Sequence, residues 1–214
     1  GGNGTVTNTG AITVTSSGQA YGIKNEAGSV ENNAVITMNA SGSYGILAKN
    51  IENSGEIYIN KSSGYGLAAT DGGSITNYGS ITASGSANDG LYGKGSSSFH
   101  NEGNITIDGQ GSWGLRSSNN VETYNSGRIN MSGNKSYGMK IEKGTVENHG
   151  DITTADAESF GIWVNNVDSL TNSGTVTVNG ADSVGIYTGG SSEATNSGTI
   201  NVNGDGGKGI NTAG

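Results

Sequence analysis

Asn172–Val178 reads NSGTVTV and is followed by the pair Gly185-Ile186, and this pattern decides the fold because it returns along the whole chain. In each copy Ile or Val lies four residues after the asparagine, and a Gly-aliphatic pair begins 13 or 14 residues after it. Successive copies are 21 to 24 residues apart, which is typical of a solenoid whose coils pack only on their neighbours. The nine asparagines are Asn8, Asn32, Asn53, Asn77, Asn101, Asn125, Asn148, Asn172 and Asn196.

Apolar residues are concentrated at four positions of each unit: two before the asparagine, then four, six and fourteen after it. Counting alanine as apolar, 34 of these 36 positions are apolar, although only 31% of the chain is hydrophobic. The i, i+2 spacing and the β-branched bias indicate three short strands per coil, closed by glycine-rich corners. The sequence therefore predicts an all-β parallel β-helix of about nine coils over residues 1–214, without a second domain.

Composition restricts the partners of such a solenoid. The net charge is −8, with ten Lys and Arg residues and no basic run, which argues against nucleic acid or an anionic membrane as a partner. The chain has 40 glycines and neither proline nor cysteine, as expected for tight corners and an uninterrupted backbone ladder. The opening residues are no signal peptide, and no apolar stretch is long enough for this segment to insert into a membrane. We expect the chain to be a fragment of a longer protein, and we expect this fragment to be monomeric.

The repeated asparagine is predicted to be structural. Stacked one coil apart, at about 4.8 Å, the side-chain amides can donate to and accept from one another. Glycine follows two residues later in every coil except the second, where Ala34 stands, and a left-handed backbone would explain that choice. The third corner, between the Gly-aliphatic pair and the next asparagine, varies in length, so we expect the irregularities of the coil to lie there.

Two further columns are rich in aromatic residues. The residue before each Gly-aliphatic pair is predicted by parity to pack on the aliphatic side of a corner, and Asp89 and Lys208 in this column suggest that it reaches water. The residue after each pair should point outward, where it either binds a ligand or merely covers the strand. The predicted ligand-binding stripe is Tyr92, Arg116, Lys140, Trp163 and Tyr187.

The repeats resemble a known family. Units that read Asn-Ser-Gly-Thr-Ile, followed by Ser-Tyr-Gly-Ile or Ser-Val-Gly-Ile, are similar to the passenger regions of large autotransporter adhesins of Gram-negative bacteria, especially those of oral anaerobes; the resemblance extends from Val6 to Ile210. It implies a right-handed β-helix, export through an outer-membrane barrel, and display on the bacterial surface. The segment would then be an adhesin or its stalk, with a host-cell surface protein, a glycan or another bacterium as partner.

Other functions remain open at this point. Right-handed β-helices also bind or degrade polysaccharides, but such sites need clustered Asp, Lys or Arg. The only aligned acidic pair singled out is Glu31 and Glu52, which lie in one outward column and could share a cation or remain hydrated, and His100 and His149 fall in different columns. Because these groups do not form a cluster, no enzyme, catalytic residue, metal site or cofactor is predicted. An ice-binding face is a third possibility, since the outward column five after the asparagine contains six threonines; its mixed flanking columns argue against a lattice match.

Overall fold

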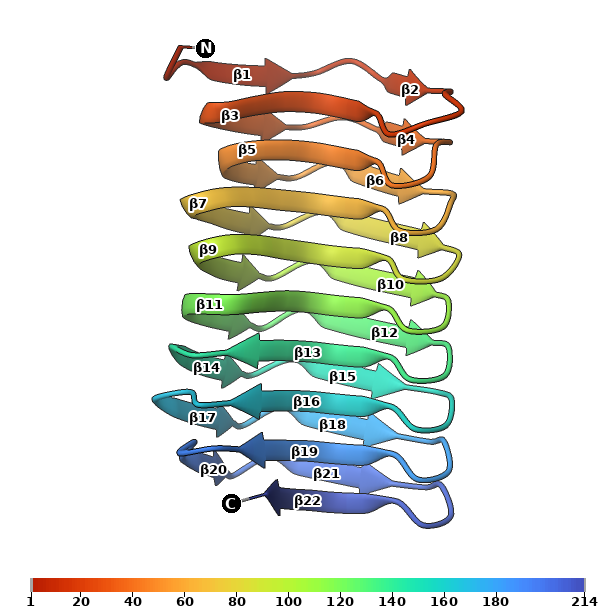
Figure 1. The fold of residues 1–214 in the computed structure, drawn as a ribbon, viewed down its shortest axis with the longest axis vertical. Coiled ribbons are helices and arrows are strands. Elements are labelled where there is room, and N and C mark those ends of the chain that lie inside the picture. Colours follow the sequence, from red (N-terminus) through yellow and green to blue (C-terminus); the bar gives the residue numbers. More distant parts are fainter. Residues whose placement is uncertain (1, 214) are drawn as a thin grey trace.

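The alternation of inward aliphatic and outward polar residues winds the chain into a parallel β-solenoid in the computed structural model, which describes residues 2–213 (Figure 1). The chain crosses the front of Figure 1 from right to left, returns behind from left to right, and descends with each turn. This path is a right-handed coil. The prediction of a right-handed parallel β-helix with about nine turns and a period near 24 residues is confirmed.

All the strand pairings within the two sheets are parallel, as Ile105 beside Ile129 illustrates. The larger sheet contains β1 (Thr5–Asn8), β3 (Tyr21–Asn32), β5 (Tyr44–Asn53), β7 (Tyr65–Asn77), β9 (Asp89–Asn101), β11 (Trp113–Asn125), β13 (Tyr137–Glu142), β14 (Thr145–Asn148), β16 (Phe160–Asn165), β17 (Ser169–Asn172), β19 (Val184–Gly189), β20 (Ala194–Asn196) and β22 (Lys208–Ala213). The second sheet contains β2 (Ile12–Val14), β4 (Ile36–Met38), β6 (Glu56–Ile59), β8 (Ser80–Ser84), β10 (Asn104–Asp108), β12 (Arg128–Ser132), β15 (Asp151–Thr154), β18 (Thr175–Val178) and β21 (Thr199–Val202).

The number of strands per coil differs from the prediction along part of the chain. The five strands β3, β5, β7, β9 and β11 each have 10 to 13 residues and join two of the three predicted strands, because pairing continues around the third corner. Only the later coils divide this path, for example into β13 and β14. The register shifts lie in the same corner, between Asn25 and Ser29 and between Ala48 and Asn50, where the sequence spacing varies.

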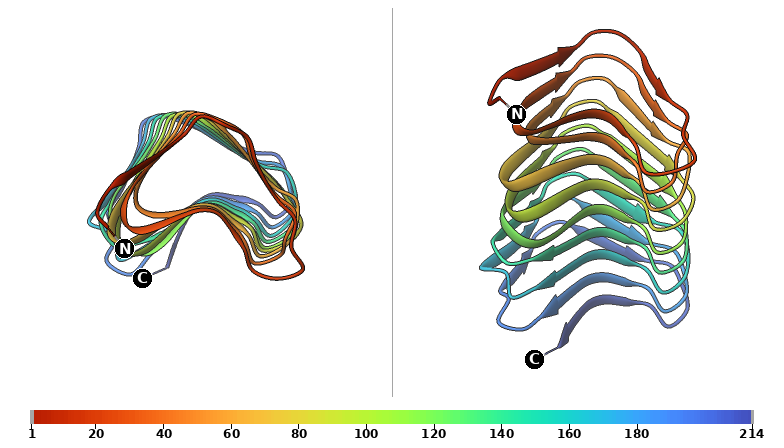
Figure 2. Two further views of the ribbon diagram at one scale, coloured as in Figure 1. Left: turned by 90° about the horizontal axis from the view of Figure 1, so that it is seen from above. Right: turned by 45° about the horizontal axis from the view of Figure 1, so that its top comes forward.

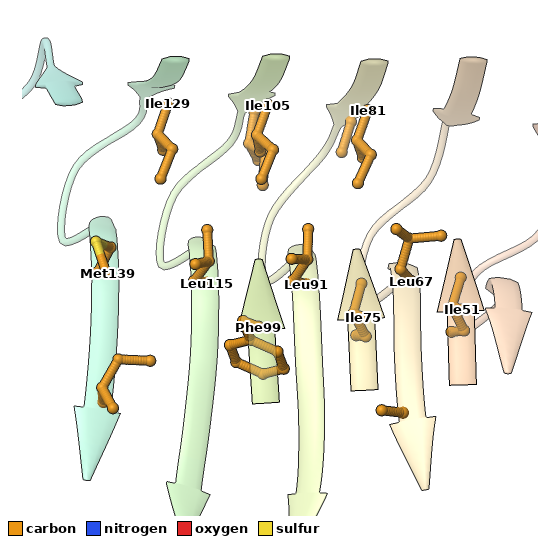
Figure 3. Packing of buried hydrophobic residues seen from close by; sticks show 14 of the residues in the cluster. Ile51, Leu67, Ile75, Ile81, Leu91, Phe99, Ile105, Leu115, Ile129 and Met139 are labelled. Atoms are coloured by element: carbon orange, nitrogen blue, oxygen red, sulfur yellow. The ribbon is translucent and has the colours of Figure 1, made fainter. Parts of the chain in front are cut away.

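The core is a continuous column of aliphatic side chains inside the coil. From the second to the eighth coil all four predicted columns are buried, and Figure 3 shows Ile81, Ile105 and Ile129 stacked opposite the leucines. Phe99 is among the largest buried side chains. At the two ends Val6 and Ile210 are 42% and 52% exposed, because a coil buries its inner face only against its neighbours.

The nine asparagines form one unbroken ladder. Each side-chain Nδ2 donates to the Oδ1 of the asparagine in the next coil, over 2.7 to 2.8 Å, as from Asn77 to Asn101 and from Asn101 to Asn125. The same Nδ2 also bonds the carbonyl oxygen two residues ahead, for example that of Gly103. The ladder thus supplies partners for polar groups that would otherwise be buried without any.

A second buried ladder was not predicted. The residue before each aromatic column position is Ser in five of the coils, and its Oγ accepts from a backbone N–H one coil earlier, as Ser136 Oγ does from Ser112 N. Asn88 Oδ1 fills the same role for the N–H of Gly64. The corner at the asparagine ladder and the corner at this serine ladder are therefore both closed by side-chain hydrogen bonds between coils.

The prediction of a left-handed backbone two residues after each ladder asparagine is wrong. Among the described residues those glycines have no positive φ; instead a Cβ at Gly103 would lie 2.0 Å from the carbonyl oxygen of Gly79 in the coil before. Close stacking, rather than backbone conformation, requires glycine there. From the second coil on, one left-handed residue lies in the turn before the aromatic column, where Ser63 and Lys135 have φ values of 61° and 58°; others lie at the third corner, such as Gly72 with a φ of 67°.

Candidate functional site

The front of the solenoid is concave. Seen along the axis, the backbone of each coil bends inward along the front strands, so the stacked coils give the front sheet a concave backbone surface (Figure 2). Two pockets lie along it, of about 410 Å³ and about 120 Å³, and Tyr92 lines both. The front strands therefore offer a recess on which outward side chains from several coils converge.

The predicted ligand-binding stripe lies on this front. Its five residues are paired one after another in neighbouring strands, from Tyr92 beside Arg116 to Trp163 beside Tyr187. The Arg116 guanidinium lies 4.8 Å from the centre of the Tyr92 ring, and the Lys140 ammonium lies 5.1 Å from that of Trp163. The rings of Trp163 and Tyr187 are stacked at 5.6 Å. The structure thus brings all five side chains together.

The aromatic column before the Gly-aliphatic pair shares this surface, which corrects the prediction from parity. Arg116 lies 4.3 Å from the ring of Trp113, three residues earlier, and Lys140 lies 5.5 Å from that of Tyr137. In a flat strand residues three apart face opposite sides, but the inward bend turns both outward here. We call the combined surface the aromatic face: Tyr21, Tyr44, Tyr65, Trp113, Tyr137 and Phe160, with Tyr92, Arg116, Lys140, Trp163 and Tyr187.

The rings of the aromatic face cover one another. Tyr44 lies 5.2 Å from Tyr21 and 4.5 Å from Tyr65, with 11° between the planes in both pairs, and Tyr137 stacks on Phe160 at 5.0 Å. Because the stacked rings occupy each other's faces, their edges and phenol hydroxyls are left for a ligand. Burial raises the pKa of Tyr44 to about 12, and the neighbouring tyrosines add to the effect, so its hydroxyl stays protonated further into the alkaline range than an ordinary tyrosine.

Asp89 interrupts the aromatic column, and it is not exposed as its charge had suggested. Its carboxylate is 1% exposed and accepts two hydrogen bonds from Arg116, Nε to Oδ1 at 2.7 Å and Nη2 to Oδ2 at 2.6 Å. Burial raises the pKa of Asp89 to about 6, although the bonds from Arg116 act in the opposite direction. The guanidinium, packed between Trp113 and Tyr92, therefore fills the gap between two runs of stacked rings.

The signal for this pair was present in the sequence but was not used. An acid stands in a column that is otherwise mostly aromatic, and Arg116 follows it by 27 residues, which is one coil of 24 plus the three residues that separate the two outward columns. The inward bend that makes this spacing a contact is a tertiary feature. Without it, alternation assigned Asp89 and Arg116 to opposite sides.

Other polar groups lie away from the aromatic face. Glu31 and Glu52 are direct neighbours in paired strands, and the described residues contain no group of three or more His, Cys, Asp or Glu that could hold a metal ion. His100 and His149, predicted to lie in different columns, are brought into one stack by Tyr124, whose ring lies 4.5 Å and 5.2 Å from theirs. A helix that is long and apolar enough to cross a membrane is absent from the described part of the chain.

Comparison with known proteins gives one match. The family model described as the BigA third pectate lyase-like domain matches residues 112–213, which are 102 of the 214 residues. This part of the chain is therefore similar to that domain, and it includes seven of the eleven residues of the aromatic face, from Trp113 to Tyr187. No curated protein and no solved structure matches the chain.

Proposed function

We propose that this chain is a segment of a bacterial surface adhesin, and that the aromatic face is its contact surface. BigA is a bacterial surface adhesin of the autotransporter-like kind, and the similarity of residues 112–213 to one of its domains supports this function. So does the resemblance of the repeats to autotransporter passengers. Export through an outer-membrane barrel, display from the outer membrane, and a role in virulence belong to the same proposal.

The observation that carries the proposal is the continuity of the aromatic face over eight coils. Aromatic and Arg side chains contribute most of the binding energy in protein interfaces, and here they lie on one concave surface of an otherwise acidic, polar solenoid. Stacking holds the rings in place before any partner arrives, which lowers the entropic cost of binding. A rigid, elongated surface of this kind suits attachment to a cell better than enclosure of a small substrate.

Binding to cells tests this function directly. The purified chain, labelled with a fluorophore, is incubated with cultured epithelial cells and with bacterial cells, and bound label is counted by flow cytometry. We expect saturable binding that is strongly reduced in the double variant Trp163→Ala, Tyr187→Ala. The matched control is Thr82→Ala with Thr106→Ala, two exposed residues of the second sheet. Absence of saturable binding, or equal binding by the double variant, would contradict the proposal.

A second candidate is action on a polysaccharide, which the description of the matched domain as pectate lyase-like favours. Arg116 and Lys140 are the cations of the aromatic face, but Arg116 is engaged with Asp89. We therefore propose binding without cleavage. Incubation with polygalacturonate and calcium, followed by absorbance of unsaturated products, tests this choice, and product formation that depends on Arg116 would reverse it.

A further inference from the structure

The pocket between Tyr44 and Tyr92 on the aromatic face lies beside an outward position that carries a small side chain. In the column that continues as Tyr92 and Arg116, the third coil has Ala68, and the second has Leu47. The space above them, about 410 Å³, is closed by tyrosines on one side and by the third corner on the other. This volume lies in the range of sites that bind small molecules or single residues of a larger ligand.

The floor and the walls of this pocket differ in chemistry. Leu47 gives an aliphatic patch on the floor, beside which Ala68 is fully buried, while Tyr44 and Tyr92 contribute ring edges and hydroxyls. Neither phenol hydroxyl has a hydrogen-bond partner within residues 2–213. At the rim, Asp71 accepts a hydrogen bond from Ser96 N with one oxygen, at 2.9 Å. The pocket thus combines an apolar surface with hydroxyl and carboxylate groups that are available to a ligand.

The charges around the pocket are balanced. Glu26 at the rim pairs with Lys24 at 3.3 Å, and Asp71 is accompanied by Lys94. Such a balance gives no attraction to a strongly charged ligand. A ligand for this pocket should therefore be uncharged, present an apolar patch to the floor, and carry several groups that both donate and accept.

We infer that the pocket above Ala68 binds a neutral pyranose residue of a glycan. A pyranose ring has C–H groups that can lie on Leu47, and hydroxyls that can bond Tyr44, Tyr92 and Asp71. Because the phenol hydroxyls donate and the carboxylate accepts, the polar lining matches the mixed character of sugar hydroxyls. This inference rests on the proposed adhesin function and specifies its ligand class. It also places the ligand outside residues 112–213, which resemble the BigA domain.

Saturation-transfer NMR on the whole chain tests the inference. The probes are galactose, glucose, mannose and N-acetylglucosamine, with N-acetylneuraminic acid as the anionic comparison. We expect signal from at least one neutral sugar and its loss in Ala68→Tyr, which fills the pocket with a residue that the same column accepts at Tyr92 and Tyr187. The control is Thr82→Tyr, beside Tyr58 on the second sheet, which should keep the signal.

The alternatives give different results. If no neutral sugar binds, if only N-acetylneuraminic acid binds, or if Ala68→Tyr binds as well as the native chain, the inference is wrong. Circular dichroism and the unfolding midpoint establish that both variants are folded. On cells, periodate oxidation of surface glycans should abolish binding of the native chain. Binding that survives periodate but is lost after protease treatment would overturn the glycan and leave the adhesin function standing, with a protein as partner.

Discussion

Replacing Asn101 by alanine removes one member from the middle of the buried ladder. Asn125 Oδ1 then loses the donor that reaches it from Asn101 at 2.8 Å, and an unpaired buried acceptor costs about 1–3 kcal/mol. Asn77 Nδ2 loses the same type of bond but retains the carbonyl of Gly79 at 3.3 Å, so its loss is about 0.5–1.5 kcal/mol. Together the two effects lower the free energy of unfolding by about 2–4 kcal/mol.

The assay is thermal unfolding followed by circular dichroism, with Asn196→Ala as the matched control. For a chain of this length the loss at Asn101 corresponds to a decrease in Tm of roughly 4–16 °C. Asn196 accepts the same bond but is exposed, so water replaces the lost partner and we expect less than about 1 kcal/mol. Equal effects of the two substitutions, or an unchanged Tm for Asn101→Ala, would refute the reasoning that burial makes the ladder stabilising.

Three further predictions concern the buried pair and a close contact. The pKa of Asp89 is about 6, above its ordinary value of 3.8, so the folded state binds this proton more tightly than the unfolded state. The stability that Asp89 contributes is therefore full below about pH 4 and is lost as pH rises through 6. The difference between the urea midpoints of the native chain and of Asp89→Asn should fall over that range. Arg116→Met leaves the carboxylate unpaired and should cost about 3–5 kcal/mol at pH 7.5 by urea unfolding, whereas Asp89→Tyr combined with Arg116→Met should restore most of it. Gly103→Ala meets the backbone of Gly79 and should cost about 3 kcal/mol or more in the same assay. Gly111→Ala, in open space with a φ of 64°, should cost only about 1–2 kcal/mol.

The periodic parts of the structure could be predicted because they repeat. The asparagine spacing specified the coils, and alternation specified which residues face inward, down to Thr123, which is buried in a column of aliphatics. When the residues at one position are compared across nine repeats, a type that recurs in most coils indicates a structural requirement, whereas a type found in one coil does not. The same reasoning explains why the irregularities were correctly expected at the third corner.

What could not be predicted depends on the shape of the coil. Alternation assumes a flat strand, but the front strands bend inward, and this bend places Arg116 beside Trp113 and Asp89. The role of Gly103 was also misassigned, because a close approach between coils and a left-handed backbone both require glycine. Lys135 and Glu158 adopt the left-handed conformation in the exposed turn, where no glycine marks it. Local sequence carries little information about either effect.

The asparagine ladder has a direction. In every step the donor belongs to the earlier coil and the acceptor to the later one, so the amide dipoles are aligned along the axis and add to one another. The two ends of any stack of these coils are therefore chemically different, since one presents amide oxygens and the other amide hydrogens. A coil that is added at the C-terminal end accepts, with its asparagine Oδ1, a hydrogen bond from the free Nδ2 of the coil before it. Its own Nδ2 then points along the axis in the same direction and can donate to the next coil. Elongation is thus templated in one sense only, and a coil that is added upside down would meet a donor with a donor.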